Sequence, residues 1–200
     1  SRPLNKTQVR NSLNLPTDKK LLLFSSMKIT DPKKGIDYLV EACKLIQKNH
    51  PDFCNSLGVV VVGKESQQYA DLFPFPIYCL NYVGNEKDLV NIYNAVDLFV
   101  TPSLQENLPN TIVEAMSCGV PCVGFNIGGI PQMIDHLHNG YVAQYKSSED
   151  LANGICWSLN EGDYASLSEE ARRKAVETYS EQNVAMKYIK IYNHITGENA

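Results

Sequence analysis

The sequence has no stretch long enough to cross a membrane and no broad excess of positive charge. A spanning helix needs roughly 20 apolar residues, whereas the longest apolar run, Leu57–Gly63, has the length of a strand. No charged start followed by an apolar segment is visible as a signal peptide, so we expect a cytoplasmic protein. The net charge of −4 argues against a broad surface for nucleic acid, and we expect no nucleic-acid partner.

The cysteines form no CxxC pair and show no spacing typical of a metal site. The six are Cys43, Cys54, Cys79, Cys118, Cys122 and Cys156. Cys79, Cys118 and Cys122 lie inside apolar segments, which predicts reduced thiols in the core of a cytosolic protein. None of the four histidines stands at a ligand spacing from the cysteines, and no acidic DxD motif occurs. We therefore expect neither a metal ion nor a cofactor.

What the chain does contain is a regular alternation of strand-like and helix-like segments. Apolar residues make up 44% of it and charged residues 20%, a composition typical of a folded domain. Strands are expected over residues 21–26, 57–63, 77–83, 97–101, 120–125 and 140–143, and helices over 35–48, 89–95, 110–118, 130–137, 148–159, 166–179 and 181–195. Four consecutive valines, Val59–Val62, indicate a strand buried on both faces. The alternation predicts an α/β fold with a Rossmann-like, doubly wound parallel sheet of about six strands.

Ligands of such sheets bind beyond the carboxyl ends of the strands, so the loops there are the first candidates for a site. The loop after the first strand carries Lys28 and Lys34 around an Asp31-Pro32 turn and leads into a helix. Two lysines beside a helix N-terminus suit an anion with two charges, such as a diphosphate. The alternative is an ordinary solvated loop. The glycine turns at Gly63 and Gly84 are weaker signals of the same kind.

The most informative loop runs from Thr101 to Met116 and holds two carboxylates, Glu106 and Glu114. Glu106 lies in the loop itself, and Glu114 about one turn into the next helix. A carboxylate near phosphates would repel them, so Glu106 makes chemical sense if it faces neutral hydroxyls, which carboxylates bind well. The free N–H groups at the helix start favour phosphate.

The segment from Glu106 to Pro121 resembles the E-x7-E signature of glycosyltransferase family 4, which comprises retaining nucleotide-sugar transferases with the GT-B fold. Other parts of the chain resemble the family in the same order: Lys28 with Lys33-Lys34-Gly35, Tyr82-Val83-Gly84, the stretch 95–103, Gly128–Pro131, Asn139-Gly140-Tyr141, and the helix with Tyr188 and Tyr192. The resemblance covers nearly all of the 200 residues.

The resemblance implies a role for each matching residue. Glu106 is expected to contact the donor sugar and Glu114 the ribose hydroxyls. Lys28 and Lys34 are expected to clamp the diphosphate and to stabilise the leaving group, because negative charge develops there as the sugar–phosphate bond breaks. The further donor-binding residues that it implies are Gly84, Asn107, Leu108, Asn110 and Thr111. Retention through attack from the leaving-group face needs no enzymic nucleophile, and the lysines can replace a metal ion.

The chain departs from the family pattern at three places, which involve four residues. Lys28 stands where the family usually has arginine, and lysine lacks the bidentate fork of a guanidinium. Asn107-Leu108 replaces a glycine and an aromatic residue, which is expected to alter the sugar pocket. Gln132 stands where many relatives carry an acid, so no role is assigned to it.

The family's architecture implies two domains, and the chain matches the second. We expect a Rossmann-like nucleotide-sugar-binding domain over residues 1–180 and a C-terminal helix over 181–200 that crosses to an acceptor-binding domain, so that the chain is a fragment inactive by itself. The implied donor is a nucleoside diphosphate sugar, a UDP-sugar by default. The implied acceptor is a glycan or glycolipid in polysaccharide assembly, with peripheral membrane association of the full-length enzyme. Two alternatives are a non-catalytic nucleotide-sugar-binding module and a nucleotide-sugar epimerase; a third is an α/β domain whose motif is coincidental.

Overall fold

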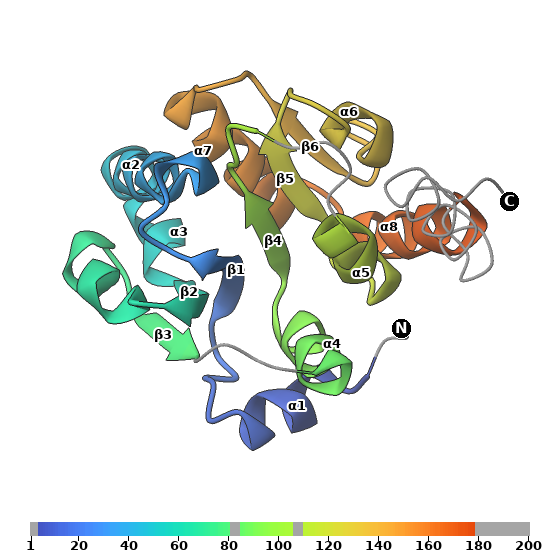
Figure 1. The fold of residues 1–200 in the computed structure, drawn as a ribbon, viewed down its shortest axis with the longest axis horizontal. Coiled ribbons are helices and arrows are strands. Elements are labelled where there is room, and N and C mark those ends of the chain that lie inside the picture. The colour runs from blue at the N-terminus through green and yellow to red at the C-terminus, as the bar shows by residue number, and fades with distance from the viewer. Residues whose placement is uncertain (1–3, 81–84, 106–109, 179–200) are drawn as a thin grey trace, which may run out of the picture.

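The computed structural model describes residues 4–80, 85–105 and 110–178 (Figure 1). The strands are β1 (Lys20–Lys28), β2 (Leu57–Lys64), β3 (Ile77–Leu80), β4 (Leu98–Thr101), β5 (Cys122–Phe125) and β6 (Gly140–Ala143). The α-helices are α1 (Lys6–Ser12), α2 (Ile36–Asn49), α3 (Pro51–Asn55), α4 (Glu86–Ala95), α5 (Asn110–Ser117), α6 (Ile130–Met133), α7 (Ser148–Cys156) and α8 (Tyr164–Thr178). Shorter helical turns are η1 (Pro32–Lys34), η2 (Ser66–Leu72) and the π-helix η3 (Trp157–Glu161).

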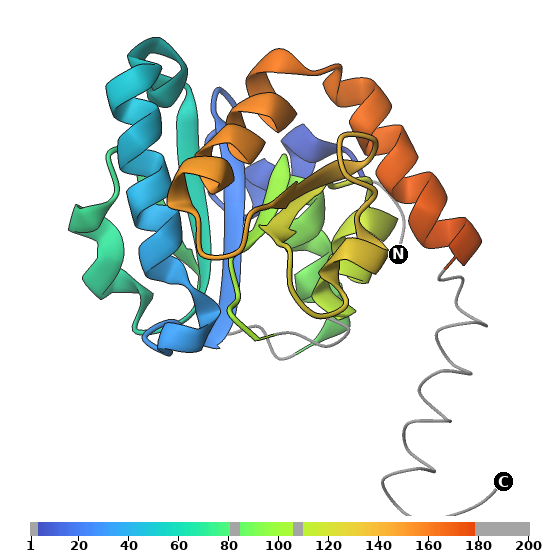
Figure 2. The ribbon, with the colours of Figure 1, turned by 90° about the horizontal axis from the view of Figure 1, so that it is seen from above.

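The six strands form one parallel sheet in the order β3-β2-β1-β4-β5-β6, which confirms the predicted fold class. Helices α2, α3 and α7 cover one face, while α1, α4, α5 and α8 cover the other, and α2 and α8 lie on opposite sides of the molecule (Figures 1 and 2). Val59 and Val61 belong to the first apolar cluster, and Val60 and Val62 to the second. The valine run is therefore buried on both faces, as predicted.

The strand order places a switch point between β1 and β4. Successive strands are added from β1 towards β3 on one side and from β4 towards β6 on the other, and Leu22 and Leu23 of β1 pair with Leu98 and Phe99 of β4. Loops that follow these two strands diverge to opposite faces, and in doubly wound sheets ligands bind at this point.

The prediction of a helix over residues 130–137 is wrong beyond Met133. Helix α6 ends there, Ile134 adopts an extended conformation, and Leu137 has a φ of 65°. The Asn139 side chain accepts a hydrogen bond from the Asp135 N–H at 2.9 Å, so a local turn satisfies the backbone in place of helix bonds.

Other elements differ from the expectations mainly at their ends. Helix α1 lies in a segment for which no helix or strand was expected, and it is stabilised by the Asn5 side chain, which accepts a hydrogen bond from the Gln8 N–H at 3.0 Å. Of the expected elements, residues 81–83, 179 and 181–195 lie outside the described part of the chain, as does the whole C-terminal helix expected over 181–200. Cys118 and Cys122 are buried as predicted, whereas Cys79 is partly exposed. Within the described residues, no helix combines the length and apolar character needed to span a bilayer.

Candidate functional site

The lysine loop, residues 29–35, links β1 to α2 at the carboxyl edge of the sheet (lower edge of Figure 2). The Asp31 side chain accepts a hydrogen bond from the Lys33 N–H at 3.0 Å and caps η1, so the predicted Asp31-Pro32 turn is present. Gly35 ends η1 in the left-handed conformation, with a φ of 78°, and precedes α2. The loop therefore presents Lys34 from a defined turn beside a helix start.

Lys28 is the last residue of β1 rather than a member of the loop, because β1 continues past an irregularity between Ser25 and Lys28. Its register partner on β2 is Lys64, and both side chains are exposed. The sequence gives Lys64 little weight, yet the sheet places it beside Lys28. Two neighbouring cations repel each other, so this corner of the carboxyl edge favours an anion.

The lysine loop packs directly against the backbone that follows β4. The Leu104 N–H donates a hydrogen bond to the Lys33 carbonyl at 2.8 Å. A Cβ atom on Gly35 would lie 1.9 Å from the Pro102 carbonyl oxygen, a distance that only a glycine permits. The structure thus brings together the two segments that the sequence singles out, which are 68 residues apart between Lys34 and Pro102.

Glu114 lies in the second turn of α5, as predicted, and is partly buried. Its Oε2 atom accepts a hydrogen bond from the Tyr93 hydroxyl of α4 at 3.1 Å. Asn110 and Thr111 are the exposed first residues of α5, whose N-terminal N–H groups lie at the carboxyl edge because the helix follows β4. The helix ends in a glycine cap, in which Gly119, with a φ of 77°, donates its N–H to the Met116 carbonyl at 2.9 Å.

Tyr145, in the loop between β6 and α7, also contacts the segment that follows β4 (residues 102–105, the β4 loop). Its hydroxyl donates a hydrogen bond to the Leu104 carbonyl at 3.0 Å, and its ring packs edge-on against Phe125 at the end of β5. Asp150 holds this loop, since it accepts hydrogen bonds from the Gln144 N–H and the Tyr141 hydroxyl, each at 2.7 Å. Burial alone would raise the pKa of Asp150, but these hydrogen bonds outweigh it and lower the pKa below its usual value. Leu104 is thus fixed through both its N–H and its carbonyl.

Four of the predicted site residues lie outside the described part of the chain: Gly84, Glu106, Asn107 and Leu108. Lys28 ends β1, Lys34 lies in the loop that follows it, and Asn110, Thr111 and Glu114 lie on the helix that follows β4. These residues therefore lie on the two sides of the switch point. Tyr93 and Tyr145 were not recognised as site residues from the sequence. Each acts on a residue at least 21 positions away, so no local pattern signals it.

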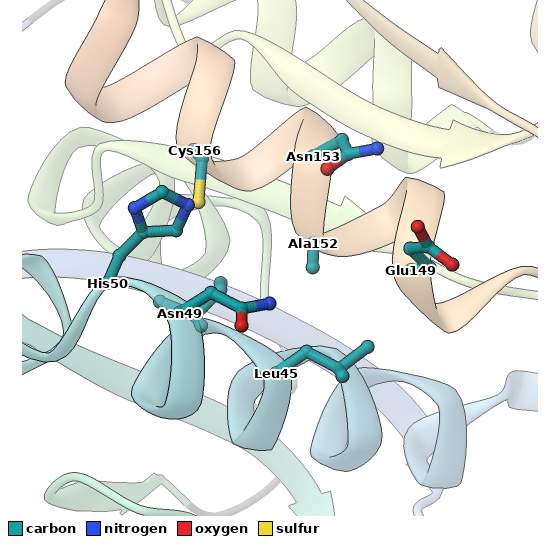
Figure 3. A pocket seen from close by; sticks show the side chains of 8 residues that line it. Leu45, Asn49, His50, Glu149, Ala152, Asn153 and Cys156 are labelled. Atoms are coloured by element: carbon teal, nitrogen blue, oxygen red, sulfur yellow. The ribbon is translucent and has the colours of Figure 1, made fainter.

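A separate hollow lies between α2 and α7, away from the switch point (Figure 3). It has a volume of about 280 Å³ and is lined by Leu45, Ile46, Asn49, His50, Glu149, Ala152, Asn153 and Cys156. None of the predicted site residues contributes to it. In the described ranges of the chain, no three His, Cys, Asp or Glu side chains gather closely enough to hold a metal ion.

Comparison with known proteins matches most of this domain to one family. The family described as "Glycosyl transferases group 1" matches residues 18–161, which include β1 to β6 and the whole switch point. The chain belongs to this family. Among curated members, an uncharacterised glycosyltransferase of Haemophilus influenzae is 28% identical over 143 residues, covering 70% of this chain and 40% of that protein. The chain spans less than half of the length of the curated relatives that it matches.

Solved glycosyltransferase structures share the fold. Sucrose-phosphate synthase from Thermosynechococcus elongatus superimposes with a TM-score of 0.76 at 22% identity, over 99% of this chain and 50% of that one. Anabaena HepE, solved in complex with UDP-glucose, superimposes with a TM-score of 0.70 at 22% identity, over 94% of this chain and 54% of that one. At such identities the likeness concerns the fold alone.

Proposed function

We propose that the chain is the donor-binding domain of a retaining, metal-independent family 4 glycosyltransferase. It binds a nucleoside diphosphate sugar, a UDP-sugar by default, whose sugar the whole enzyme moves to an acceptor hydroxyl. The observation that carries this proposal is the meeting of the lysine loop and the β4 loop at the switch point, through Gly35 against Pro102 and Lys33 against Leu104.

The residue types at that point suit the chemistry. Lys28 ends β1 and Lys34 lies in the loop after it, where cations offset the negative charge that develops on a departing diphosphate. Glu114, which follows β4, accepts hydrogen bonds and suits the ribose diol. Glu106 takes the donor sugar in this scheme. The N-terminal N–H groups of α5 add a partial positive charge towards the phosphates.

The relatives support a uridine nucleotide and a two-domain enzyme. HepE was solved with UDP-glucose, and a curated relative from Escherichia coli, 28% identical over 157 residues, is named for UDP-Gal as donor. Because the chain spans less than half of such relatives, we propose that an acceptor-binding domain belongs to the same enzyme. That domain binds a glycan or glycolipid acceptor in polysaccharide assembly at the cytoplasmic membrane face. The chain alone then binds donor without transferring sugar.

A nucleotide panel tests the proposal. We expect UDP to bind this chain more tightly than GDP or ADP in calorimetric titrations. Glu114→Ala should weaken UDP binding by about tenfold, because it removes charge-assisted bonds to the ribose. Glu106→Ala should leave UDP binding nearly unchanged and weaken UDP-sugar binding relative to UDP, because it acts on the sugar.

Glu149→Ala is the matched control, since Glu149 is an exposed carboxylate of α7 beside the separate hollow. This variant should change neither the affinity for UDP nor the affinity for the UDP-sugar. Failure of all three nucleotides to bind would refute the donor site, and an equal loss of UDP binding in Glu106→Ala and Glu114→Ala would refute the division of roles.

A further inference from the structure

Tyr93 connects the core of the domain to the site carboxylate Glu114. Its side chain is 2% exposed and packs edge-on against Phe99 of β4, with ring centroids 6.2 Å apart. Its hydroxyl lies at the end of this packed ring and donates to Glu114 Oε2 at 3.1 Å. The ring's position is set by packing, so the direction of the hydrogen bond is set as well.

The chemistry of the pair keeps Tyr93 a donor. Burial, followed by the negative charge of Glu114 and the hydrogen bond to it, raises the pKa of the Tyr93 hydroxyl well above its usual value. The hydroxyl therefore stays protonated wherever the protein is folded, and Glu114 accepts its proton in a hydrogen bond. A buried tyrosine hydroxyl without a partner is costly, which favours a single orientation of the carboxylate.

A glutamate side chain in a helix can adopt several rotamers, and a diol needs a carboxylate in one orientation. A carboxylate offers about four acceptor positions, so the bond from Tyr93 is compatible with further bonds to two hydroxyls. A hydrogen bond from a rigid neighbour orients a binding group before the ligand arrives, so that less order must be imposed on binding.

We propose that Tyr93 is a positioning residue that orients Glu114 towards the ribose diol and thereby sets the preference of the site for ribonucleotides. This inference rests on the proposed function. It predicts that Tyr93 acts on the recognition of the ribose hydroxyls and leaves the recognition of the diphosphate unchanged.

The test compares UDP with 2′-deoxy-UDP and 3′-deoxy-UDP, titrated calorimetrically against the 200-residue chain and its Tyr93→Phe variant. The phenylalanine keeps the ring and its packing and removes the hydroxyl. The parent chain should prefer UDP over each deoxy analogue by about tenfold, the worth of a good charge-assisted hydrogen bond. In Tyr93→Phe the preference should fall to roughly threefold or less, because each deoxy analogue keeps one ribose hydroxyl and should lose less affinity than UDP does.

Tyr164→Phe is the matched control, because the Tyr164 hydroxyl also donates a 2.7 Å hydrogen bond, to the Asp97 carbonyl at the opposite edge of the sheet. It should lower the melting temperature and leave the preference for ribose unchanged. In the Glu114→Ala background, Tyr93→Phe should have no further effect on UDP binding, as expected for a residue that acts through the carboxylate.

The outcomes separate this inference from the proposed function. An unchanged ribose preference in folded Tyr93→Phe, or additive losses in the double variant, would overturn the positioning role while the donor site stands. If the parent chain binds UDP but does not distinguish it from the deoxy analogues, the ribose role of Glu114 fails, and the role of Tyr93 with it. If the parent chain binds no nucleotide, the proposed function itself fails.

Discussion

Residues of opposite charge are neighbours at the amino end of β4. At the carboxyl ends of β1 and β2, by contrast, the neighbouring residues carry the same charge. Asp97, just before β4, accepts hydrogen bonds from the Arg10 guanidinium at 2.7 Å and from the Leu21 N–H at 2.8 Å. Arg10 is 4% exposed and also donates to the Ala95 and Lys19 carbonyls, at 2.6 and 2.8 Å. This cluster ties α1 to the starts of β1 and β4, and its members satisfy one another.

The carboxyl end presents the opposite arrangement. Lys28 and Lys64 are exposed register partners on adjacent strands, and the lysine loop adds Lys33 and Lys34 nearby. Neighbouring like charges do not stabilise a sheet, so their presence calls for a reason other than folding. The charged residues at the amino end therefore support the fold, whereas those at the carboxyl end suit an anionic ligand.

The largest effect is expected at the amino end, from Arg10→Met. It leaves the Asp97 carboxylate, 14% exposed, without its buried partner, and the loss of one member of a buried ion pair costs about 3–5 kcal/mol. Urea denaturation should show a loss of this size in the free energy of unfolding. The affinity of the folded variant for UDP should stay unchanged.

Lys6→Met provides the control for that loss. Lys6 pairs with the same Asp97 carboxylate at 2.5 Å, but its side chain is 38% exposed, so its removal should cost about 1 kcal/mol or less. Equal losses in the two variants would mean that burial of the pair does not matter, and a loss of UDP binding in folded Arg10→Met would mean that the two ends are coupled.

A smaller effect of a different kind is expected at the carboxyl end, from Lys28→Met. It removes a cation next to Lys64 and from the proposed diphosphate clamp. The affinity for UDP should fall by about tenfold, which corresponds to about 1.4 kcal/mol, while the free energy of unfolding stays the same or rises slightly as the repulsion is relieved. Calorimetry and urea denaturation measure the two quantities separately.

Lys48→Met is the matched control, because it removes the same charge from an exposed lysine in the last turn of α2, at the amino side of the sheet. It should leave UDP binding unchanged at moderate salt. The proposed contrast between the two ends would be wrong if Lys28→Met destabilised the domain as much as Arg10→Met does. It would also be wrong if Lys48→Met weakened UDP binding as much as Lys28→Met does.

The sequence predicts the sheet and the segments of the site better than it predicts the contacts between them. The continuous apolar run along β2 reflects burial on two faces, and the glycine after α5 reflects a left-handed cap. Both are local requirements, so these elements were confirmed. The irregularity that extends β1 to Lys28 and the end of α6 at Met133 depend on pairing with β2 and on the Asn139 side chain. Such tertiary partners leave no periodic signal in the segment itself.

The same distinction applies to the site. The types and spacing of Lys34 and Glu114 are visible in the sequence, and the structure confirms where Glu114 lies on its helix. The bond from Tyr93 to Glu114 requires α4 and α5 to be packed side by side, and the contact of Gly35 with Pro102 requires β1 and β4 to be neighbours. These contacts follow from strand order, which local sequence does not encode.

The smallest effect is expected from two tyrosine hydroxyls that each donate to a backbone carbonyl, one at either end of the sheet. Tyr145→Phe at the carboxyl end removes the 3.0 Å bond to Leu104 and keeps the ring against Phe125, whereas Tyr164→Phe at the amino end removes the 2.7 Å bond to Asp97. Each should lower the free energy of unfolding by about 0.5–1.5 kcal/mol. Leu104 lies two residues before Glu106, so Tyr145→Phe alone should weaken UDP-sugar binding, by roughly two- to threefold in calorimetric titrations, and leave bare UDP unchanged. The two variants lose the same kind of bond. A loss of UDP-sugar affinity in both would show that the loss comes from general destabilisation. A loss of UDP-sugar affinity in neither would show that the Tyr145 bond to Leu104 is not needed for sugar binding.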